Sequence, residues 1–115
     1  MALLGDGSAM YAIQGLWTAA RYQLDLTVVI LANRGYEIIR AGLRRQGGSA
    51  AAAGAYLGTD LADPEIDWAS MASAMGLNYR ACSGAGEIAE AALSLERHDG
   101  PGLLRVAVDG DFTLP

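Results

Sequence analysis

Apolar residues along the chain gather in four short runs, separated by longer stretches in which apolar positions recur with a helical period. The run Leu26–Ala32 is continuous and rich in β-branched residues, which is typical of a parallel strand covered on both faces. The other three runs are also expected to form strands. They are Leu3–Leu4, which leads into a Gly-Asp-Gly turn, Leu77–Cys82 and Leu103–Val108.

The stretches between these runs predict helices over residues 9–22, 36–45, 68–75 and 84–97. Asp67 suits the N-cap of the third helix, and Gly76 suits the position just past its end. The side chains expected to face the core are Ile13, Leu16, Trp17, Ala20, Ile38, Ile39, Leu43, Trp68, Met71, Ala72, Met75, Ile88, Ala91, Ala92 and Leu95.

Strands and helices therefore alternate along the chain. This order predicts an α/β fold, with a parallel sheet of about four strands and helices on both faces, because the crossovers between parallel strands are right-handed. Residues 46–66 lack a clear period. We expect either a mobile segment there or a helical turn at Ala50–Ala53, and the sequence leaves both open. Residues 109–115 are expected to form a frayed tail.

Composition limits the possible partners. A chain of 115 residues makes one domain at most, and its net charge of −5 disfavours nucleic acid and anionic membranes. The longest clean apolar run is far too short to span a bilayer. The single cysteine, Cys82, has no partner for an internal disulfide, which agrees with a cytoplasmic location.

Candidate chemistry lies directly behind the first two strands. Gly5-Asp6-Gly7-Ser8 follows the first strand, and Asn33-Arg34-Gly35-Tyr36 follows the second. Ligands of open α/β sheets bind at the carboxyl ends of strands. Glycines beside Asp6 let the backbone approach an anion, and a helix beginning there directs free N–H groups toward it. Asp6 and Asn33 supply the oxygen ligands that Mg²⁺ or Ca²⁺ prefers, so the motifs predict a site for a metal-bridged diphosphate.

These motifs, with Asn33 twenty-seven positions after Asp6, resemble the cofactor-binding motif of thiamine-diphosphate-dependent enzymes. The wider match, from Gly5 to Tyr36, resembles the acetolactate synthase and benzoylformate decarboxylase branch. The family usually has two consecutive asparagines, and Ala32 replaces the first of them here. Ile39 stands where pyruvate-decarboxylase-like members have a catalytic glutamate, and benzoylformate-decarboxylase-like members are apolar there.

The resemblance implies that Asp6, Asn33 and the backbone carbonyl of Gly35 bind Mg²⁺, which holds the diphosphate of the cofactor. It also places Gly7 and Ser8 against phosphate oxygens. The full set implied for cofactor binding is Gly5, Asp6, Gly7, Ser8, Asn33, Gly35 and Tyr36, and no catalytic residue is identified in this chain. The ordinary alternative is that Asp6 and Asn33 are turn residues without a ligand.

Other polar residues receive structural interpretations. Glu37 is expected to complement the dipole at the start of its helix, and His98 is expected to do so at a helix end. Arg40, Arg44 and Arg45 are expected to form a solvated face, with a substrate-carboxylate role for one of them as the alternative.

On this resemblance, residues 1–115 are the C-terminal part of the diphosphate-binding domain of a 2-oxo acid decarboxylase or carboligase, a lyase or transferase. The pyrimidine-binding domain with its catalytic glutamate is absent from the sequence. We therefore expect a fragment or split subunit that is inactive alone and works on a 2-oxo acid within a homo-oligomer or with a subunit carrying that domain. The alternatives are an inactive orphan fragment and a small Rossmann-like nucleotide-binding module, although the glycine spacing is not that of the dinucleotide motif.

Overall fold

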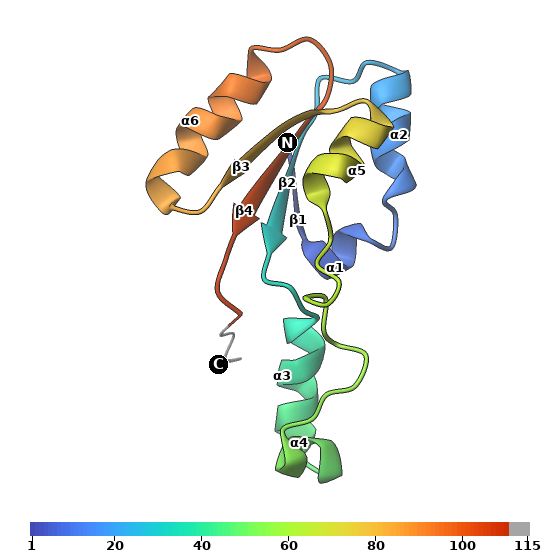
Figure 1. The fold of residues 1–115 in the computed structure, drawn as a ribbon, viewed down its shortest axis with the longest axis vertical. Helices are drawn as coiled ribbons and strands as arrows, with labels where there is room; N and C mark the ends of the chain where they lie inside the picture. The colour runs from blue at the N-terminus through green and yellow to red at the C-terminus, as the bar shows by residue number, and fades with distance from the viewer. Residues whose placement is uncertain (111–115) are drawn as a thin grey trace.

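The structure is a computed structural model that describes residues 1–110. Across them, four parallel strands form one sheet with the order β1-β2-β4-β3 (Figure 1). Their bounds are β1 Ala2–Gly5, β2 Thr27–Ala32, β3 Asn78–Cys82 and β4 Gly102–Ala107. The parallel sheet of about four strands that the sequence predicts is confirmed. The tail expected over residues 109–115 lies outside the described residues from position 111 onward.

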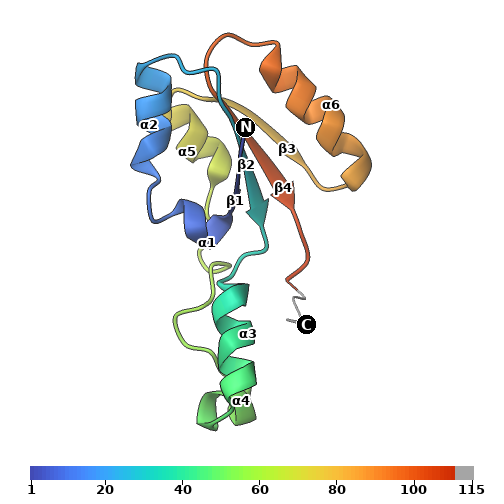
Figure 2. The ribbon, with the colours of Figure 1, turned by 180° about the vertical axis from the view of Figure 1, so that it is seen from behind.

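Helices cover both faces of the sheet, as expected. Figures 1 and 2 show α2 and α5 on one face and α6 on the other, while α3 and α4 extend past the carboxyl ends of the strands. The helices are α1 Asp6–Ala9, α2 Gln14–Arg21, α3 Glu37–Gln46, α4 Ser49–Ala53, α5 Trp68–Met75 and α6 Ala85–Glu96. Within residues 1–110, no helix has the length and apolar character needed to cross a membrane.

The core has two layers because successive side chains of β2 and β4 point to opposite faces. Ile30 and Leu103 belong to the layer under α2 and α5, whereas Val29 and Leu104 pack under α6 with Leu95. Ile30, Leu103 and Leu104 are all 0% exposed. The central strand β2 is therefore covered on both faces, as its continuous apolar run predicts.

The helix predicted over 9–22 is shorter than expected, because α2 spans Gln14–Arg21 and residues 10–13 form a turn. The amides of Tyr11, Ala12 and Leu16 each donate to the carbonyl three residues earlier, at 3.1–3.2 Å. In this tighter winding, successive residues turn by a larger angle than in an α-helix. Ile13, Leu16 and Ala20 face the core as predicted, but Trp17, also predicted to be core, is 57% exposed.

The apolar face predicted for the next helix is also wrong. Ile38 is 67% exposed and Ile39 is 44% exposed, because α3 lies beyond the strand ends and has no sheet to pack on (Figure 1). The buried residues of α3 are Glu37 and Ala41, and Leu43 is half-buried.

The segment 46–66 and the helix after it are ordered. Of the two possibilities left open for the segment, the structure has the helical turn, α4, at Ser49–Ala53. Asp67 is the N-cap of α5, since its Oδ1 accepts a 2.9 Å hydrogen bond from the Ser70 amide. Gly76 ends α5 in the left-handed conformation, with φ of 80°. Both predictions for the ends of α5 are confirmed.

Truncating the centre of the sheet should destabilise the fold. We expect Leu104→Ala to lower the free energy of unfolding by about 2–5 kcal/mol, because the cavity it leaves is fully enclosed. Leu57→Ala is the control, since Leu57 is 96% exposed and should change stability by no more than about 0.5 kcal/mol. Urea denaturation followed by circular dichroism measures both, and equal effects would contradict the assignment of the core.

The cap of α5 should give stability a pH dependence. Hydrogen bonds from the Ser70 side chain and amide hold the pKa of Asp67 below its usual value. A group whose pKa is lowered by folding stabilises the native state above its unfolded pKa, and this contribution disappears as pH falls. Asp67→Asn should therefore unfold at a lower temperature than the parent chain at neutral pH. The gap should narrow between about pH 5 and pH 2, and a gap that widens there would contradict the assignment.

Candidate metal and anion site

The two polar motifs lie side by side at the carboxyl ends of β1 and β2. These strands are adjacent and parallel, and Gly5 is in register with Leu31. Asp6 therefore leaves β1 at nearly the level at which Asn33 leaves β2. The structure confirms the predicted arrangement of strand, turn, helix, strand and turn that brings the motifs together.

Asp6 links the two motifs directly. It is 3% exposed, its Oδ1 accepts from the Gly7 amide at 2.7 Å, and its Oδ2 accepts from the Arg34 amide at 2.7 Å. A carboxylate has about four lone-pair sites, so each oxygen keeps capacity for a further partner. A carboxylate buried this deeply is costly unless it is well paired, and its two bonds span both strand ends.

Arg34 shows what this link does to the backbone. Its φ is 60°, in the left-handed region that residues other than glycine adopt at a cost of roughly 1–2 kcal/mol. The bond from its amide to Asp6 holds that conformation. The chain consequently turns sharply after β2, and this turn presents Asn33 and Gly35.

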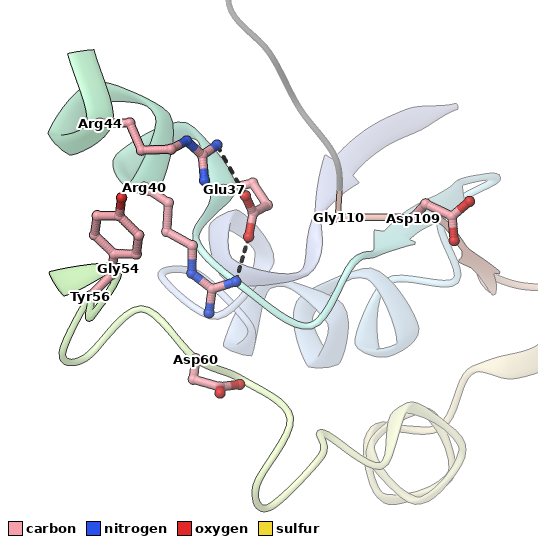
Figure 3. Close-up of a pocket in the computed structure, with 8 residues that line it drawn as sticks. All are labelled: Glu37, Arg40, Arg44, Gly54, Tyr56, Asp60, Asp109 and Gly110. Carbon is pink, nitrogen blue, oxygen red and sulfur yellow. Dashed lines mark hydrogen bonds and ion pairs between the residues drawn. The ribbon is translucent and has the colours of Figure 1, made fainter. Parts of the chain in front are cut away.

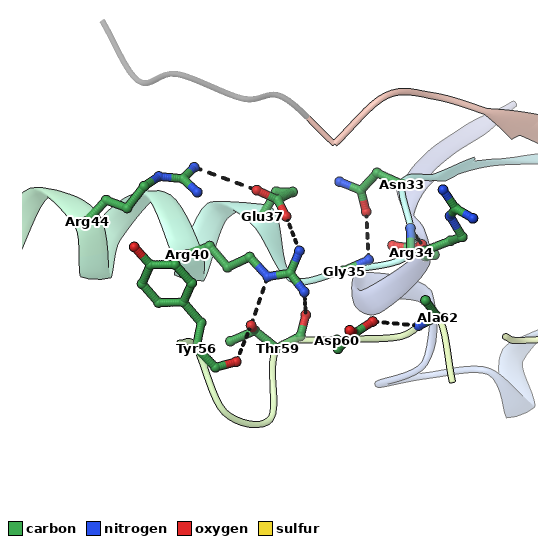
Figure 4. Close-up of polar contacts among 11 residues, drawn as sticks. Asn33, Arg34, Gly35, Glu37, Arg40, Arg44, Tyr56, Thr59, Asp60 and Ala62 are labelled. Carbon is green, nitrogen blue, oxygen red and sulfur yellow. Dashed lines mark hydrogen bonds and ion pairs between the residues drawn. The ribbon is translucent and has the colours of Figure 1, made fainter. Parts of the chain in front are cut away.

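Asn33 and Gly35 share one side of this turn. Gly35 forms an antiparallel bridge with Asp60, and the hydrogen bonds of the bridge come from the flanking residues: Tyr36 N donates to Thr59 O, and Leu61 N donates to Arg34 O, both at 2.9 Å. In such a pair, the amide and carbonyl of Gly35 itself point away from the partner segment. Asn33 Oδ1 accepts from the Gly35 amide at 3.1 Å, and Figure 4 shows it opposite Asp60.

Gly7 and Tyr36 close the two motifs against each other. A Cβ atom on Gly7 would lie 2.5 Å from Cε1 of the Tyr36 ring, so the ring occupies the space that only glycine leaves. The Tyr36 ring also meets Tyr11 edge to face, with centroids 6.4 Å apart. The observed contact of Gly7 is therefore packing, and the phosphate contact that the resemblance implies stays a prediction.

The helix that begins at the first motif is shorter than predicted. Because α1 ends at Ala9, its dipole at Gly5 and Ser8 is that of about one turn rather than that of the expected helix over 9–22. Gly5 is the N-cap of α1 and Ser8 is exposed. An anion bound here would therefore gain little from a helix macrodipole.

The donor set fits a hard cation. Among residues 1–110, no three His, Cys, Asp or Glu side chains form a group that can hold a metal. The Asp6 carboxylate, the Asn33 amide oxygen and the Gly35 carbonyl instead offer three oxygen donors of different kinds. Mg²⁺ is typically bound by one or two carboxylates and completes its six positions with phosphate oxygens and water. These residues therefore suit Mg²⁺ bound together with a diphosphate.

A second polar cluster lies on α3, and for Arg40 it corrects the prediction of a solvated arginine face. Glu37 is 7% exposed and pairs with Arg40 and, at 3.6 Å, with Arg44 (Figure 4). Arg40 also donates to Thr59 through Nε to Oγ1 at 2.8 Å and through Nη2 to O at 2.9 Å. Of the three arginines, Arg44 and Arg45 are exposed, as expected, and Arg40 is half-buried.

The cluster borders an open pocket (Figure 3). Glu37, Arg40 and Arg44 could have been grouped from the sequence, since residues three and four apart share a helix face. The sequence does not indicate that Thr59 joins this cluster, because it lies in a segment without hydrophobic periodicity. The lining residues of the pocket are Glu37, Arg40, Arg44, Gly54, Tyr56, Asp60, Asp109 and Gly110.

Comparison with known proteins identifies relatives over nearly the whole chain. The family model described as "Thiamine pyrophosphate enzyme, C-terminal TPP binding domain" matches residues 1–106. The Mycobacterium tuberculosis protein named "Putative acetolactate synthase large subunit IlvX" is 39% identical over 94% of this chain and 21% of its own length. The acetolactate synthase isozyme 2 large subunit of Escherichia coli is 34% identical over 91% of this chain and 18% of its own length.

A solved structure agrees with these relatives. The thiamine diphosphate-dependent 4-hydroxybenzoylformate decarboxylase of Rhodococcus jostii RHA1 superposes with a TM-score of 0.80 at 33% identity, over 95% of this chain and 19% of its own. The chain thus spans about a fifth of the length of the curated relatives it matches. Both motifs lie inside the matched region.

The packing between the motifs predicts a specific coupling. Gly7→Ala should lower the free energy of unfolding by about 1–3 kcal/mol, because the added methyl group collides with the Tyr36 ring. The same change in a Tyr36→Ala background should cost much less, since the ring is gone. A double-mutant cycle by urea denaturation measures the coupling.

Gly15→Ala is the matched control. No atom lies within 4 Å of the Cβ that it would add within α2, so it should raise stability by up to about 1 kcal/mol. Additive effects of Gly7→Ala and Tyr36→Ala would contradict the proposed contact.

Proposed function

Because the chain belongs to the thiamine pyrophosphate enzyme family, as its C-terminal TPP-binding domain, we propose that it binds the cofactor jointly with Mg²⁺ at the carboxyl ends of β1 and β2. Asp6, Asn33 and the carbonyl of Gly35 are the proposed metal ligands. Gly5, Gly7, Ser8 and Tyr36 complete the proposed cofactor site.

One observation carries this proposal: the buried Asp6 carboxylate accepts hydrogen bonds from both motifs, at the Gly7 and Arg34 amides. These bonds fix the carboxylate at the junction of two strand ends and leave further lone pairs on its oxygens. Asn33 and the Gly35 carbonyl share the same side of the following turn. A residue serving only the turn after β1 would not need a link to the second motif.

The cofactor and the protein residues have separate proposed roles. Thiamine diphosphate supplies, when bound, the electron sink for breaking a bond beside the carbonyl of a 2-oxo acid. The protein residues position it: the proposed ligands fix the cation that neutralises the diphosphate charge. Contact between Gly7 and Tyr36 keeps the two motifs at a constant separation.

The complete enzyme that we propose is a 2-oxo acid decarboxylase or carboligase. Similarity to acetolactate synthase large subunits and to a 4-hydroxybenzoylformate decarboxylase supports this class. Since the 115 residues span about a fifth of those relatives, we propose that activity needs a pyrimidine-binding domain in addition to these residues. The proposed setting is cytoplasmic, in agreement with the buried free thiol of Cys82.

Binding measured by calorimetry tests the proposal. The parent chain should bind thiamine diphosphate only when Mg²⁺ is present. Asp6→Asn and Asn33→Ala should each weaken that binding by at least about tenfold, as changes around metal sites commonly do. Mg²⁺–ADP should not compete, which separates this function from that of a nucleotide-binding module.

Asp25→Asn is the matched control for Asp6→Asn. Asp25 is exposed and precedes β2, at the opposite end of the sheet from the motifs. This variant should bind with the affinity of the parent chain. Unchanged affinity in both the Asp6 and the Asn33 variants would overturn the assignment of the metal ligands.

A further inference from the structure

The stretch from Arg34 to Tyr36 is held from outside by a segment far along the chain. Residues 59–61 form the antiparallel bridge that fixes Gly35: Tyr36 N donates to Thr59 O, and Leu61 N donates to Arg34 O. Two hydrogen bonds alone make a weak ladder, because so short a backbone pairing opens easily by local fluctuation. The segment therefore needs another anchor to stay in place.

Arg40 is that anchor. Its Nε donates to Thr59 Oγ1 and its Nη2 donates to Thr59 O, so it binds the residue whose carbonyl also accepts from Tyr36 N. Thr59 is 4% exposed, and its hydroxyl donates to Tyr56 O at 2.7 Å. The hydroxyl and the carbonyl of Thr59 are thus both hydrogen-bonded, and Arg40 donates two of these bonds (Figure 4).

Arg40 also lies directly against Gly35. A Cβ atom on Gly35 would lie 2.8 Å from Arg40 Nη1 and 3.0 Å from Cζ. The guanidinium group therefore packs on the α-carbon of the residue whose carbonyl is a proposed metal ligand. Gly35 is buried between this group and the turn made by Asn33, so displacement of Arg40 frees the peptide to rotate.

The charge of Arg40 serves a separate purpose. Its Nη1 pairs with the buried carboxylate of Glu37, and Arg44 pairs with the same carboxylate at 3.6 Å. If Arg40 moves away, Glu37 therefore still has Arg44 as a cationic partner. A lysine at position 40 would keep the charge but would lack the planar set of donors that reaches Glu37 and both Thr59 acceptors together.

From these contacts we propose that Arg40 is a positioning residue for the cation: through Thr59 it holds residues 59–61 against Gly35 and so aims the Gly35 carbonyl at the metal. The inference rests on the proposed function, since it assumes that Mg²⁺ binds there with thiamine diphosphate. It assigns Arg40 no contact with the metal or the cofactor. Mutation of groups that orient metal ligands commonly weakens metal affinity by about 10–100-fold.

Two variants of the 115-residue chain test the proposal. Arg40→Lys keeps the charge beside Glu37 and removes the paired bonds to Thr59, while Thr59→Val removes one acceptor and keeps every charge. Arg45→Lys is the matched control, because Arg45 lies on the same helix and is exposed. Two readouts apply to each variant: the Mg²⁺ affinity at saturating thiamine diphosphate, and amide hydrogen exchange at Tyr36 and Leu61 without metal. Circular dichroism checks the fold.

We expect Arg40→Lys to weaken Mg²⁺ binding by about 10–100-fold and to speed exchange at both amides, with Thr59→Val changing both in the same direction. Arg45→Lys should match the parent chain. If Arg40 acted only by neutralising Glu37, lysine would restore the parent affinity, and that result would overturn the proposal. Faster exchange with unchanged Mg²⁺ affinity would also overturn it.

Two further outcomes are distinguishable. If Arg40→Lys fails to fold, Thr59→Val decides, and parent-like affinity in that variant would refute the role of the Arg40–Thr59 pair. If the parent chain itself does not bind Mg²⁺ with thiamine diphosphate, the proposed function fails and the role of Arg40 fails with it. Binding by the parent chain therefore reports on the function, and the difference between variants reports on Arg40.

Discussion

The bond from the Arg34 amide to Asp6 Oδ2, 2.7 Å long, is the interaction on which the site depends. It joins the ends of two neighbouring parallel strands through one buried side chain, and it stabilises the left-handed backbone at Arg34. Without it, the turn after β2 would lose the constraint that orients Asn33 and Gly35. The sheet brings the two motifs close together, because β1 and β2 are adjacent. The bond between Arg34 and Asp6 then fixes how the motifs are oriented.

Two layers of support surround that bond. Closest to it, the Tyr36 ring fills the space left open at Gly7, so the two motifs are in direct contact. Farther out, the segment 59–61 and the arginine–glutamate cluster of α3 hold the other side of Gly35. Ligand geometry in metal sites depends on such outer contacts as much as on the ligands. The elements beyond the sheet are therefore part of the site, although they contribute little to the core.

Much of this arrangement follows from the sequence, and the exceptions have physical reasons. The parallel sheet of about four strands, the position of both motifs and the ends of α5 come from local patterns: apolar runs, glycines and a capping aspartate. Trp17 was predicted to be core because it lies four positions after Ile13, but the buried side of α2 runs through Leu16 and Ala19. The bonds from Arg40 to Thr59 were missed, since Thr59 is brought to α3 by a segment with no period of its own.

A crystal structure of the chain with Mg²⁺ and thiamine diphosphate tests the central claim most directly. The account predicts one cation at the ends of β1 and β2, with an Asp6 carboxylate oxygen, the Asn33 amide oxygen and the Gly35 carbonyl each at about 2.0–2.1 Å, and the diphosphate completing its coordination. A cation bound elsewhere, or one that Asp6 and Asn33 do not share, would contradict it.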